Sequence, residues 1–235
     1  MKIRVLPVCF ALLSLMVCLP VTAEDLTIIS TVTDGKGKSV PSTQYITQNK
    51  VRTSDGRYDT IMDLESERII HIDNKKKTYE ETTLEELRQH FAQLEENMGG
   101  MMGAVFGGAG EVEVTKGTES RQVAGYECDH YLMTIGKKFQ FDLWAARGLS
   151  APYHYHDAKK MAYAAMGPMA SRFDKLYEEM KEIDGFPLMT KVDTRVVGLK
   201  VQSTSEATEV RKGPIPADVF EPPAGYKKKK KSSLQ

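Results

Sequence analysis

Apolar and polar residues alternate along most of the chain, in short runs that are separated by turn residues. Leu26 to Thr33 alternates and is rich in Ile, Val and Thr, until Asp34-Gly35-Lys36-Gly37 interrupts it. Such alternation of β-branched side chains is typical of half-buried strands. Most connections are too short to cross over to a parallel neighbour, so we predict an antiparallel meander. Further strands are predicted over residues 40–48, 50–53, 58–64, 68–73, 78–81, 111–116, 122–135, 138–145, 188–197 and 199–211.

Two segments have the three-four spacing of an amphipathic helix instead. The first begins at Thr83, which caps it together with Glu86 in a capping box. Its apolar stripe consists of Leu84, Leu87, Phe91, Leu94 and Met98. The second region covers residues 155–183 and is divided by Gly167-Pro168. Its stripe consists of Met166, Met169, Phe173, Leu176, Met180 and Ile183.

These elements predict a mainly β member of the α+β class. About nine or ten strands in meander order form a sheet that curls, because strands twist. Each helix needs apolar surface to cover its stripe, and the sheet offers the largest such surface. We therefore predict a curved antiparallel half-barrel sheet with the two helices on its concave face. Between the first helix and the next strand, residues 98–110 form a glycine-rich loop that also carries Met101, Met102 and Phe106.

The first residues have the features of a secretory signal. Lys2 and Arg4 precede an apolar stretch, and Val21-Thr22-Ala23 forms a small-residue cleavage pattern. We predict cleavage after Ala23 and a periplasmic or secreted protein. Attachment of lipid at Cys18 is the alternative, although Val17 is a poor residue before a lipidated cysteine. The predicted organisation is a signal peptide over 1–23, one domain over 24–226 and a disordered lysine-rich tail over 227–235.

Charge and cysteine content narrow the function further. The chain has 32 basic and 32 acidic residues, but two of the cations lie in the signal and five in the run Lys227 to Lys231. The remaining body is therefore near −7, which excludes a basic surface for nucleic acid. The lysine run itself is an alternative site of peripheral contact with anionic membrane phosphates. Cys128 is the one cysteine left after cleavage, and we expect it to be a buried small side chain.

Motifs of enzymes are absent from the sequence. It contains no Gly-x-Ser-x-Gly elbow, no phosphate-binding loop and no His-Glu-x-x-His pattern, so we predict a protein that is not an enzyme and needs no cofactor. A metal site is a weaker alternative. His154 and His156 could hold copper, with His130 as a third ligand, but their spacing matches no established metal motif.

Four short segments resemble a known group of proteins. They are Tyr126-Glu127-Cys128, Asp142-Leu143-Trp144-Ala145, Gly185-Phe186-Pro187-Leu188 and Phe220 to Tyr226. Together with the order of elements, they resemble an uncharacterised family of exported bacterial proteins that is similar to the periplasmic lipoprotein carriers LolA and LolB. The resemblance implies an eleven-stranded half-barrel capped by helices, a cavity for acyl chains and no catalytic residues.

The carriers also use an arginine as a latch for their lid. The sequence leaves this role open among Arg52, Arg57 and Arg68.

The predicted function is a binding or carrier protein for a hydrophobic ligand, such as a lipid or a lipoprotein acyl chain. Methionine suits such a cavity because its unbranched, polarizable side chain adapts to irregular ligands. The alternative is an envelope interaction or sensor module with a filled cavity and a protein partner. The predicted lid and cavity residues are Leu87, Phe91, Leu94, Met98, Met101, Met102, Phe139, Phe141, Met166, Met169, Phe173 and Met180.

Overall fold

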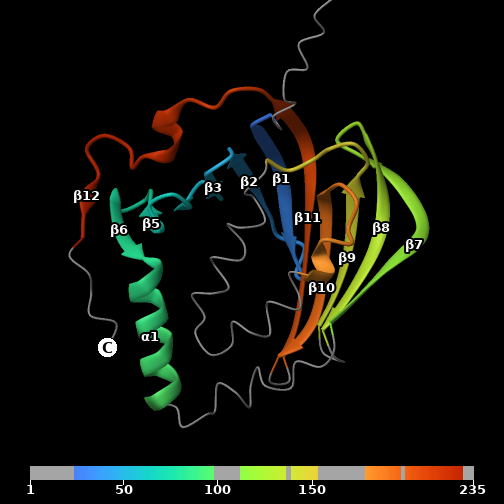
Figure 1. Ribbon diagram of the computed structural model, residues 1–235, viewed down its shortest axis with the longest axis horizontal. Coiled ribbons are helices and arrows are strands. Elements are labelled where there is room, and N and C mark those ends of the chain that lie inside the picture. Colours follow the sequence, from blue (N-terminus) through green and yellow to red (C-terminus); the bar gives the residue numbers. More distant parts are fainter. Residues whose placement is uncertain (1–23, 98–111, 136–138, 153–177, 197–198, 230–235) are drawn as a thin grey trace, which may run out of the picture.

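A computed structural model describes residues 24–97, 112–135, 139–152, 178–196 and 199–229. Twelve strands form one open, curved sheet, in the order β12-β6-β5-β4-β3-β2-β1-β11-β10-β9-β8-β7 (Figure 1). Every pairing is antiparallel except that of β12 with β6. The elements are β1 (Leu26–Asp34), β2 (Ser39–Ile46), β3 (Lys50–Ser54), β4 (Tyr58–Asp63), β5 (Arg68–Asp73), β6 (Thr78–Thr83), α1 (Leu84–Asn97), β7 (Val112–Val123), β8 (Tyr126–Ile135), β9 (Phe139–Ala146), β10 (Phe186–Val196), β11 (Leu199–Lys212), the 3-10 helix η2 (Ala217–Phe220) and β12 (Lys227–Lys228).

The register of the strands defines the two faces of the sheet. Leu26, Ile46, Val51, Met62 and Ile69 lie opposite one another across β1 to β5 and therefore share one face. We call this the inner face, because α1 packs against it and it is the concave side of the arc (Figure 1). The opposite side is the outer face.

The first helix begins as its sequence predicts. The Thr83 hydroxyl accepts a hydrogen bond from the Glu86 backbone N–H, and the Glu86 carboxylate accepts one from the Thr83 N–H. This capping box satisfies two N–H groups that the helix leaves without partners. Leu84 is buried and, with half-buried Leu87, packs near Ile69. The first turn of the helix thus packs against the inner face at the β5–β6 side of the sheet.

The second predicted helical region lies mostly outside the described residues. Its end is helical at residues 178–180, and Ile183 is buried against the inner face of β7 to β9. Among the described residues, no helix is long and apolar enough to cross a membrane.

One predicted strand is in fact two. The sequence predicts a continuous strand over residues 122–135, but Ala124 and Gly125 form a two-residue turn between β7 and β8. Both have positive φ, 49° and 82°, which matches the twist of a tight hairpin. The signal is weak because alanine rarely marks such a turn. Strand β7 is also longer than predicted, since it continues past an irregularity between Lys116 and Ser120.

The C-terminal segment after β11 crosses the outer face of β3 to β6 (Figure 1). We call residues 213–226 the strap. Phe220, at the end of η2, is 3% exposed and packs with Ile61, Ile70 and Ile72. The strap leads into β12, where Lys227 and Lys228 pair with β6. The prediction of a disordered tail from residue 227 is therefore wrong at these positions, because the free edge of β6 offers backbone hydrogen bonds.

Candidate functional site

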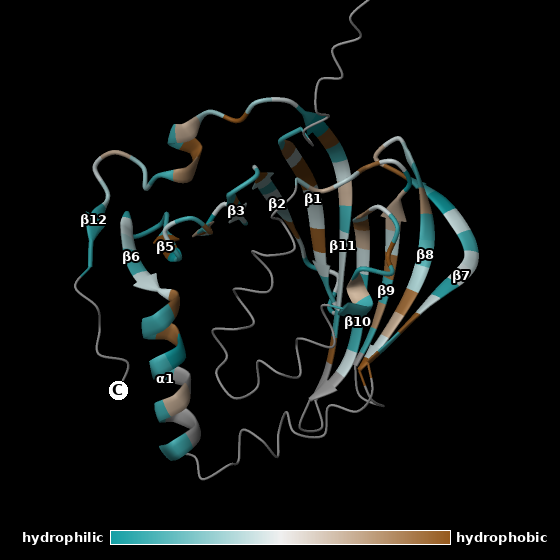
Figure 2. Cartoon of the chain, viewed as in Figure 1, coloured by the Kyte–Doolittle hydropathy of each residue, from teal (hydrophilic) through white to brown (hydrophobic). Residues whose placement is uncertain are grey.

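The inner face of β7 to β10 forms an apolar wall. Val114, Met133, Phe141 and Val192 lie opposite one another in one row, and Tyr131 and Leu143 lie in the next. In Figure 2 these strands carry alternating hydrophobic and hydrophilic positions, as expected for a sheet with one covered face. The wall is covered in this structure. Its members Val112, Tyr131, Met133 and Leu143 are only 2–6% exposed.

One end of the sheet is closed by the largest apolar cluster. Leu26 and Ile46 meet Phe186 and Leu188 there, and the segment after β9 contributes Leu149, which is 1% exposed. Because the ends of β1, β2, β9 and β10 all contribute, this cluster joins the two halves of the sheet. It seals the inner face at that end.

A pocket of about 120 Å³ lies on the inner face beside this cluster. Among the described residues that line it, five carry hydroxyl or amide side chains and none is charged. Ser30 lies opposite Ser42, and Thr190 lies opposite Ser205. Thr190 is in turn opposite Leu143, so the pocket adjoins the apolar wall. The lining residues are Ile28, Ser30, Ser42, Gln44, Phe186, Pro187, Leu188, Thr190 and Ser205.

The pocket includes none of the predicted lid and cavity residues, most of which lie outside the described part of the chain. Ligand pockets usually enclose about 300–1,000 Å³, so 120 Å³ holds a small group and not an acyl chain. Its lining is also more polar than expected. A long apolar ligand therefore needs the wall as well as the pocket, and it must displace what covers the wall.

The structure places three of the predicted lid and cavity residues. Phe141 and Met180 pack in one cluster with Tyr131 and Leu143. Leu87 lies in a separate cluster with Leu84 and Ile69. Their role in binding stays a prediction. The side chains of the other nine lie outside the described part of the chain, namely Phe91, Leu94, Met98, Met101, Met102, Phe139, Met166, Met169 and Phe173.

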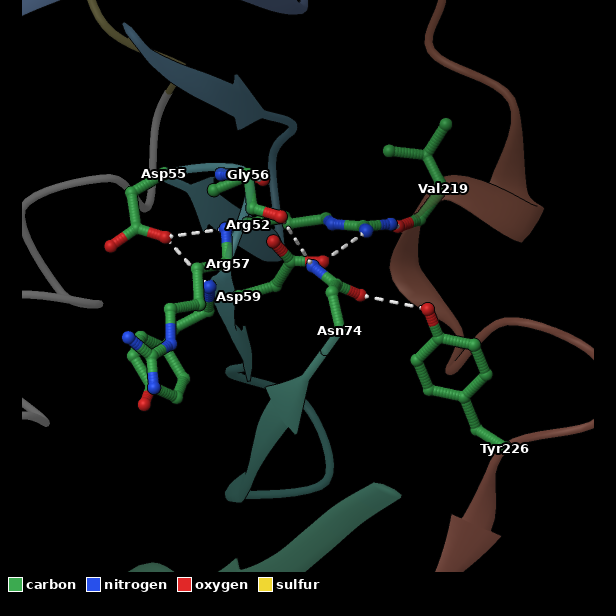
Figure 3. Close-up of polar contacts among 10 residues, drawn as sticks. Arg52, Asp55, Gly56, Arg57, Asp59, Asn74, Val219 and Tyr226 are labelled. Carbon is green, nitrogen blue, oxygen red and sulfur yellow. Dashed lines mark hydrogen bonds and ion pairs between the residues drawn. The ribbon is translucent and has the colours of Figure 1, made fainter. Parts of the chain in front are cut away.

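Arg52 holds the strap against the outer face (Figure 3). Its guanidinium donates a 2.6 Å hydrogen bond to the Val219 carbonyl oxygen and a 2.5 Å bond to Asp59, whose side chain is 1% exposed. Arg52 Nε and Asp59 Oδ1 are buried without a partner among the described residues. The Tyr226 hydroxyl donates to the Asn74 side chain, 3.1 Å away, and attaches the strap a second time.

This geometry bears on the latch that the resemblance implies. By register, Arg52 and Arg68 both lie on the outer face, where Arg68 pairs with Glu81 at 3.8 Å. Arg57 stacks over the ring of Tyr58, which is 46% exposed. Arg52 and Arg68 are thus on the wrong side of the sheet to latch a cover over the inner face.

A buried carboxylate binds two cations on the inner face of β7 and β8, next to the apolar wall. Asp129, in β8, is 4% exposed and accepts hydrogen bonds from Arg147 and from Lys116, the latter at 2.8 Å. The hydrogen bonds from Arg147 and Lys116 lower the pKa of Asp129 to about 2, although burial opposes the shift. Arg147 also binds Glu127 at 2.9 Å. The cluster joins β7, β8 and the segment after β9.

Cationic side chains surround Trp144 on the outer face. Arg121 and Lys191 lie 5.4 and 5.0 Å from the ring centroid, and His130 lies 4.8 Å away. His130 Nε2 is 2.9 Å from Asp142 Oδ1. The Trp144 side chain is therefore covered, at 6% exposed, and stabilised by cation–π contacts.

The described residues offer no support for the metal alternative. His154 and His156 lie outside the described residues, and His130 is bound to Asp142. In the described part of the chain, no three potential ligands lie close enough to hold a metal ion.

Two smaller predictions concern Cys128 and the lysine run. Cys128 is free and 0% exposed, as predicted, and burial raises the pKa of its thiol. Lys228 pairs with Glu81, and Lys229 lies 3.3 Å from Glu80. Because these lysines bind acidic residues of β6, they attract a membrane less than free lysines would.

Sequence reasoning missed most of the pocket and wall. Tyr131 and Met133 occur in a segment with apolar residues at both parities, so alternation did not reveal which ones face inward. Ser30, Ser42, Gln44, Thr190 and Ser205 look like ordinary solvent-facing strand residues. Only the curvature and covering of the sheet place them on a buried face.

Comparisons with solved structures find similarity to distant proteins. An uncharacterized conserved protein from Thermus thermophilus is 6% identical, with a TM-score of 0.48 over 88% of this chain and 90% of that one. MucB in complex with MucA from Pseudomonas aeruginosa is 11% identical, with a TM-score of 0.42, and this chain spans only 56% of it while 86% of this chain is covered. A LolA superfamily protein, NE2245 from Nitrosomonas europaea, is 6% identical, with a TM-score of 0.31 over 86% and 91% of the two chains. At these values, the similarities assign no function.

The sequence itself identifies the family. No curated protein matches the chain. A family profile matches residues 39–226, which include all four segments that carried the predicted resemblance to an uncharacterised domain family, and that prediction is confirmed. The chain therefore belongs to the family described as Domain of unknown function (DUF4412).

Proposed function

We propose that this domain is an exported binding or carrier protein that shelters a hydrophobic ligand, such as a lipid or a lipoprotein acyl chain, against the inner face of its sheet. The observation that carries the proposal is the apolar wall. Val114, Met133 and Phe141 continue one apolar row across three strands of a concave face. Export rests on the signal-like residues 1–23 of the sequence. The proposal involves no catalytic step.

The energetics of such a complex are favourable. Burial of a chain of about 16 carbons supplies roughly 0.8 kcal/mol for each methylene, or about 10 kcal/mol before ordering costs. Part of this gain is lost, because the wall is already covered and the cover must move. We therefore expect binding of an acyl chain to be measurable but weaker than this sum.

The test uses the full chain purified without detergent. Native mass spectrometry and organic extraction should find an acyl lipid bound to the protein, and a dansylated undecanoic acid should bind with enhanced fluorescence. Val114→Gln places an amide on the wall and should weaken probe binding about 10-fold, since it replaces buried apolar surface. Thr115→Gln changes the next residue of β7, which is exposed, and serves as the control. Absence of both lipid and probe binding would overturn the proposal.

The covered wall also favours a second candidate, an envelope interaction module with a filled inner face. With Met133 and Leu143 at 6% and 5% exposure, the wall is as buried as an ordinary core. In this case Val114→Gln destabilises the fold, no acyl lipid is bound, and a protein partner would use other surfaces. The lipid measurement separates the two candidates.

A further inference from the structure

We infer that the inner pocket binds an uncharged, hydrogen-bonding head group, so that the ligand is an amphipathic lipid with a glyceryl-type or amide head and not an ionised fatty acid. The inference rests on the proposed function and specifies the class of its ligand. It follows from the residues that line the pocket, from their lack of partners and from their position beside the apolar wall.

The first step is the chemistry of the lining. Ser30, Ser42, Thr190 and Ser205 supply hydroxyl groups and Gln44 supplies an amide. A hydroxyl can donate and accept a hydrogen bond, and an amide does both as well, so together they match a group with mixed donors and acceptors. No Lys, Arg, Asp or Glu lines the pocket among the residues that the structure describes. An ionised head group would therefore be removed from water without a counter-charge, which is costly.

The second step is the lack of partners. In the described part of the chain, none of these five side chains makes a side-chain hydrogen bond, although each is half-buried. None of their polar atoms is among the buried ones without a partner, so water reaches them and a ligand can take the place of that water. Elsewhere the same chain pairs its hydroxyls: Thr33 binds Ser39 at 2.8 Å, and Thr208 binds the Ile29 carbonyl at 3.2 Å. Hydroxyls from β1, β2, β10 and β11 that converge without partners are ready for a ligand.

The third step is position. Thr190 is directly opposite Leu143 on the neighbouring strand, about 5 Å away. The pocket hydroxyls therefore lie next to the apolar wall. Ile28, Phe186 and Leu188 close the pocket on the side of the end cluster. A head group in the pocket therefore directs its acyl chain toward Leu143 and Met133. The volume of 120 Å³ corresponds to about four water molecules, which suits a small head.

The test compares two ligands of equal chain length on the full chain at pH 8. Glyceryl monopalmitate and palmitate each displace the dansylated undecanoic acid from the protein. We expect glyceryl monopalmitate to bind about 10-fold more tightly than palmitate, whose carboxylate is ionised. Thr190→Val removes one hydroxyl without changing shape and should weaken glyceryl monopalmitate about 3- to 10-fold while leaving palmitate unchanged. Thr204→Val, on the outer face of β11, should change neither ligand.

The outcomes separate the two proposals. If neither ligand binds, the proposed function fails. If palmitate binds as tightly as glyceryl monopalmitate, or if Thr190→Val weakens the binding of both equally, the pocket does not select an uncharged head group. The proposal of a hydrophobic binding site is unaffected by that result. Thermal unfolding of both variants confirms that they are folded before binding is compared.

Discussion

Two kinds of region on this sheet treat polar side chains in opposite ways. In the charged clusters, side chains bind each other or the strap, as Arg52 binds Asp59 and the Val219 carbonyl on the outer face and Lys116 binds Asp129 on the inner face. In the inner pocket, the hydroxyls of Ser42, Thr190 and Ser205 have no side-chain partner in the described part of the chain, and solvent reaches them. Polar groups that stabilise a fold are expected to be mostly paired. The difference indicates that the charged clusters serve the structure and that the inner pocket serves binding.

The largest effect on stability should come from the pair of Arg52 with Asp59 on the outer face. Asp59→Asn leaves Arg52 with a charge that is 16% exposed and no acidic partner, and losing one partner of a buried pair costs about 3 kcal/mol in the free energy of unfolding. Urea denaturation measures this change. Glu209→Gln, which breaks the exposed pair with Arg211, is the control and should leave stability unchanged. If Asp59→Asn proves as neutral as the control, the strap is not held by this pair.

A smaller and pH-dependent effect is expected at Asp129. Its pKa is about 2 in the folded protein, below the ordinary value of 3.8, so the folded state favours the carboxylate. The resulting stabilisation is complete above about pH 5 and is lost progressively as pH falls through 3.8 and then through 2, because the unfolded state binds the proton first. Asp129→Asn should therefore cost about 1–2 kcal/mol at pH 7 and much less at pH 2.5. Urea titrations of both proteins at the two pH values test this, and a difference that persists at pH 2.5 would contradict the assignment.

The smallest effect on stability should come from the inner pocket, because its hydroxyls are expected to serve binding and not the fold. Thr190→Val removes a hydroxyl that has no partner in the described part of the chain, so the free energy of unfolding should change by less than about 0.5 kcal/mol or increase slightly. Thermal and urea unfolding measure it. A loss above 1 kcal/mol would mean that the hydroxyl already serves the fold, and the contrast between the charged clusters and the pocket would weaken.

Much of the fold was predictable because it depends on local patterns. Alternation identified β1, β5 and β9 to within about two residues, and Thr83 with Glu86 marked the start of α1. The turn at Ala124 and Gly125 was missed, since its residues continue an apolar run. The strap was missed for another reason. Phe220 and Tyr226 find their partners on strands more than 140 residues earlier, and no local pattern records such a contact.

The candidate site was predicted only in outline. The alternation of Phe141 and Leu143 indicated an apolar face, and the structure joins Phe141 to Met180 on it. Of the arginines suggested for a latch, Arg52 and Arg68 lie on strands, whereas Arg57 lies in the turn between β3 and β4. The parity that puts Arg52 and Arg68 on the outer face follows from pairing with neighbouring strands.

The sequence by itself determined that this is a mainly β protein of the DUF4412 family with an amphipathic helix that packs on an antiparallel sheet, because period and capping are properties of neighbouring residues. Only the tertiary structure decided which face is covered, that residues 213–226 cross the outer side, and that hydroxyls from four strands meet beside an apolar wall. A serine or threonine in a strand has the same local pattern whether it faces water or a buried pocket. Its surroundings are set by strands far away in the chain, and these surroundings decide what the side chain can bind.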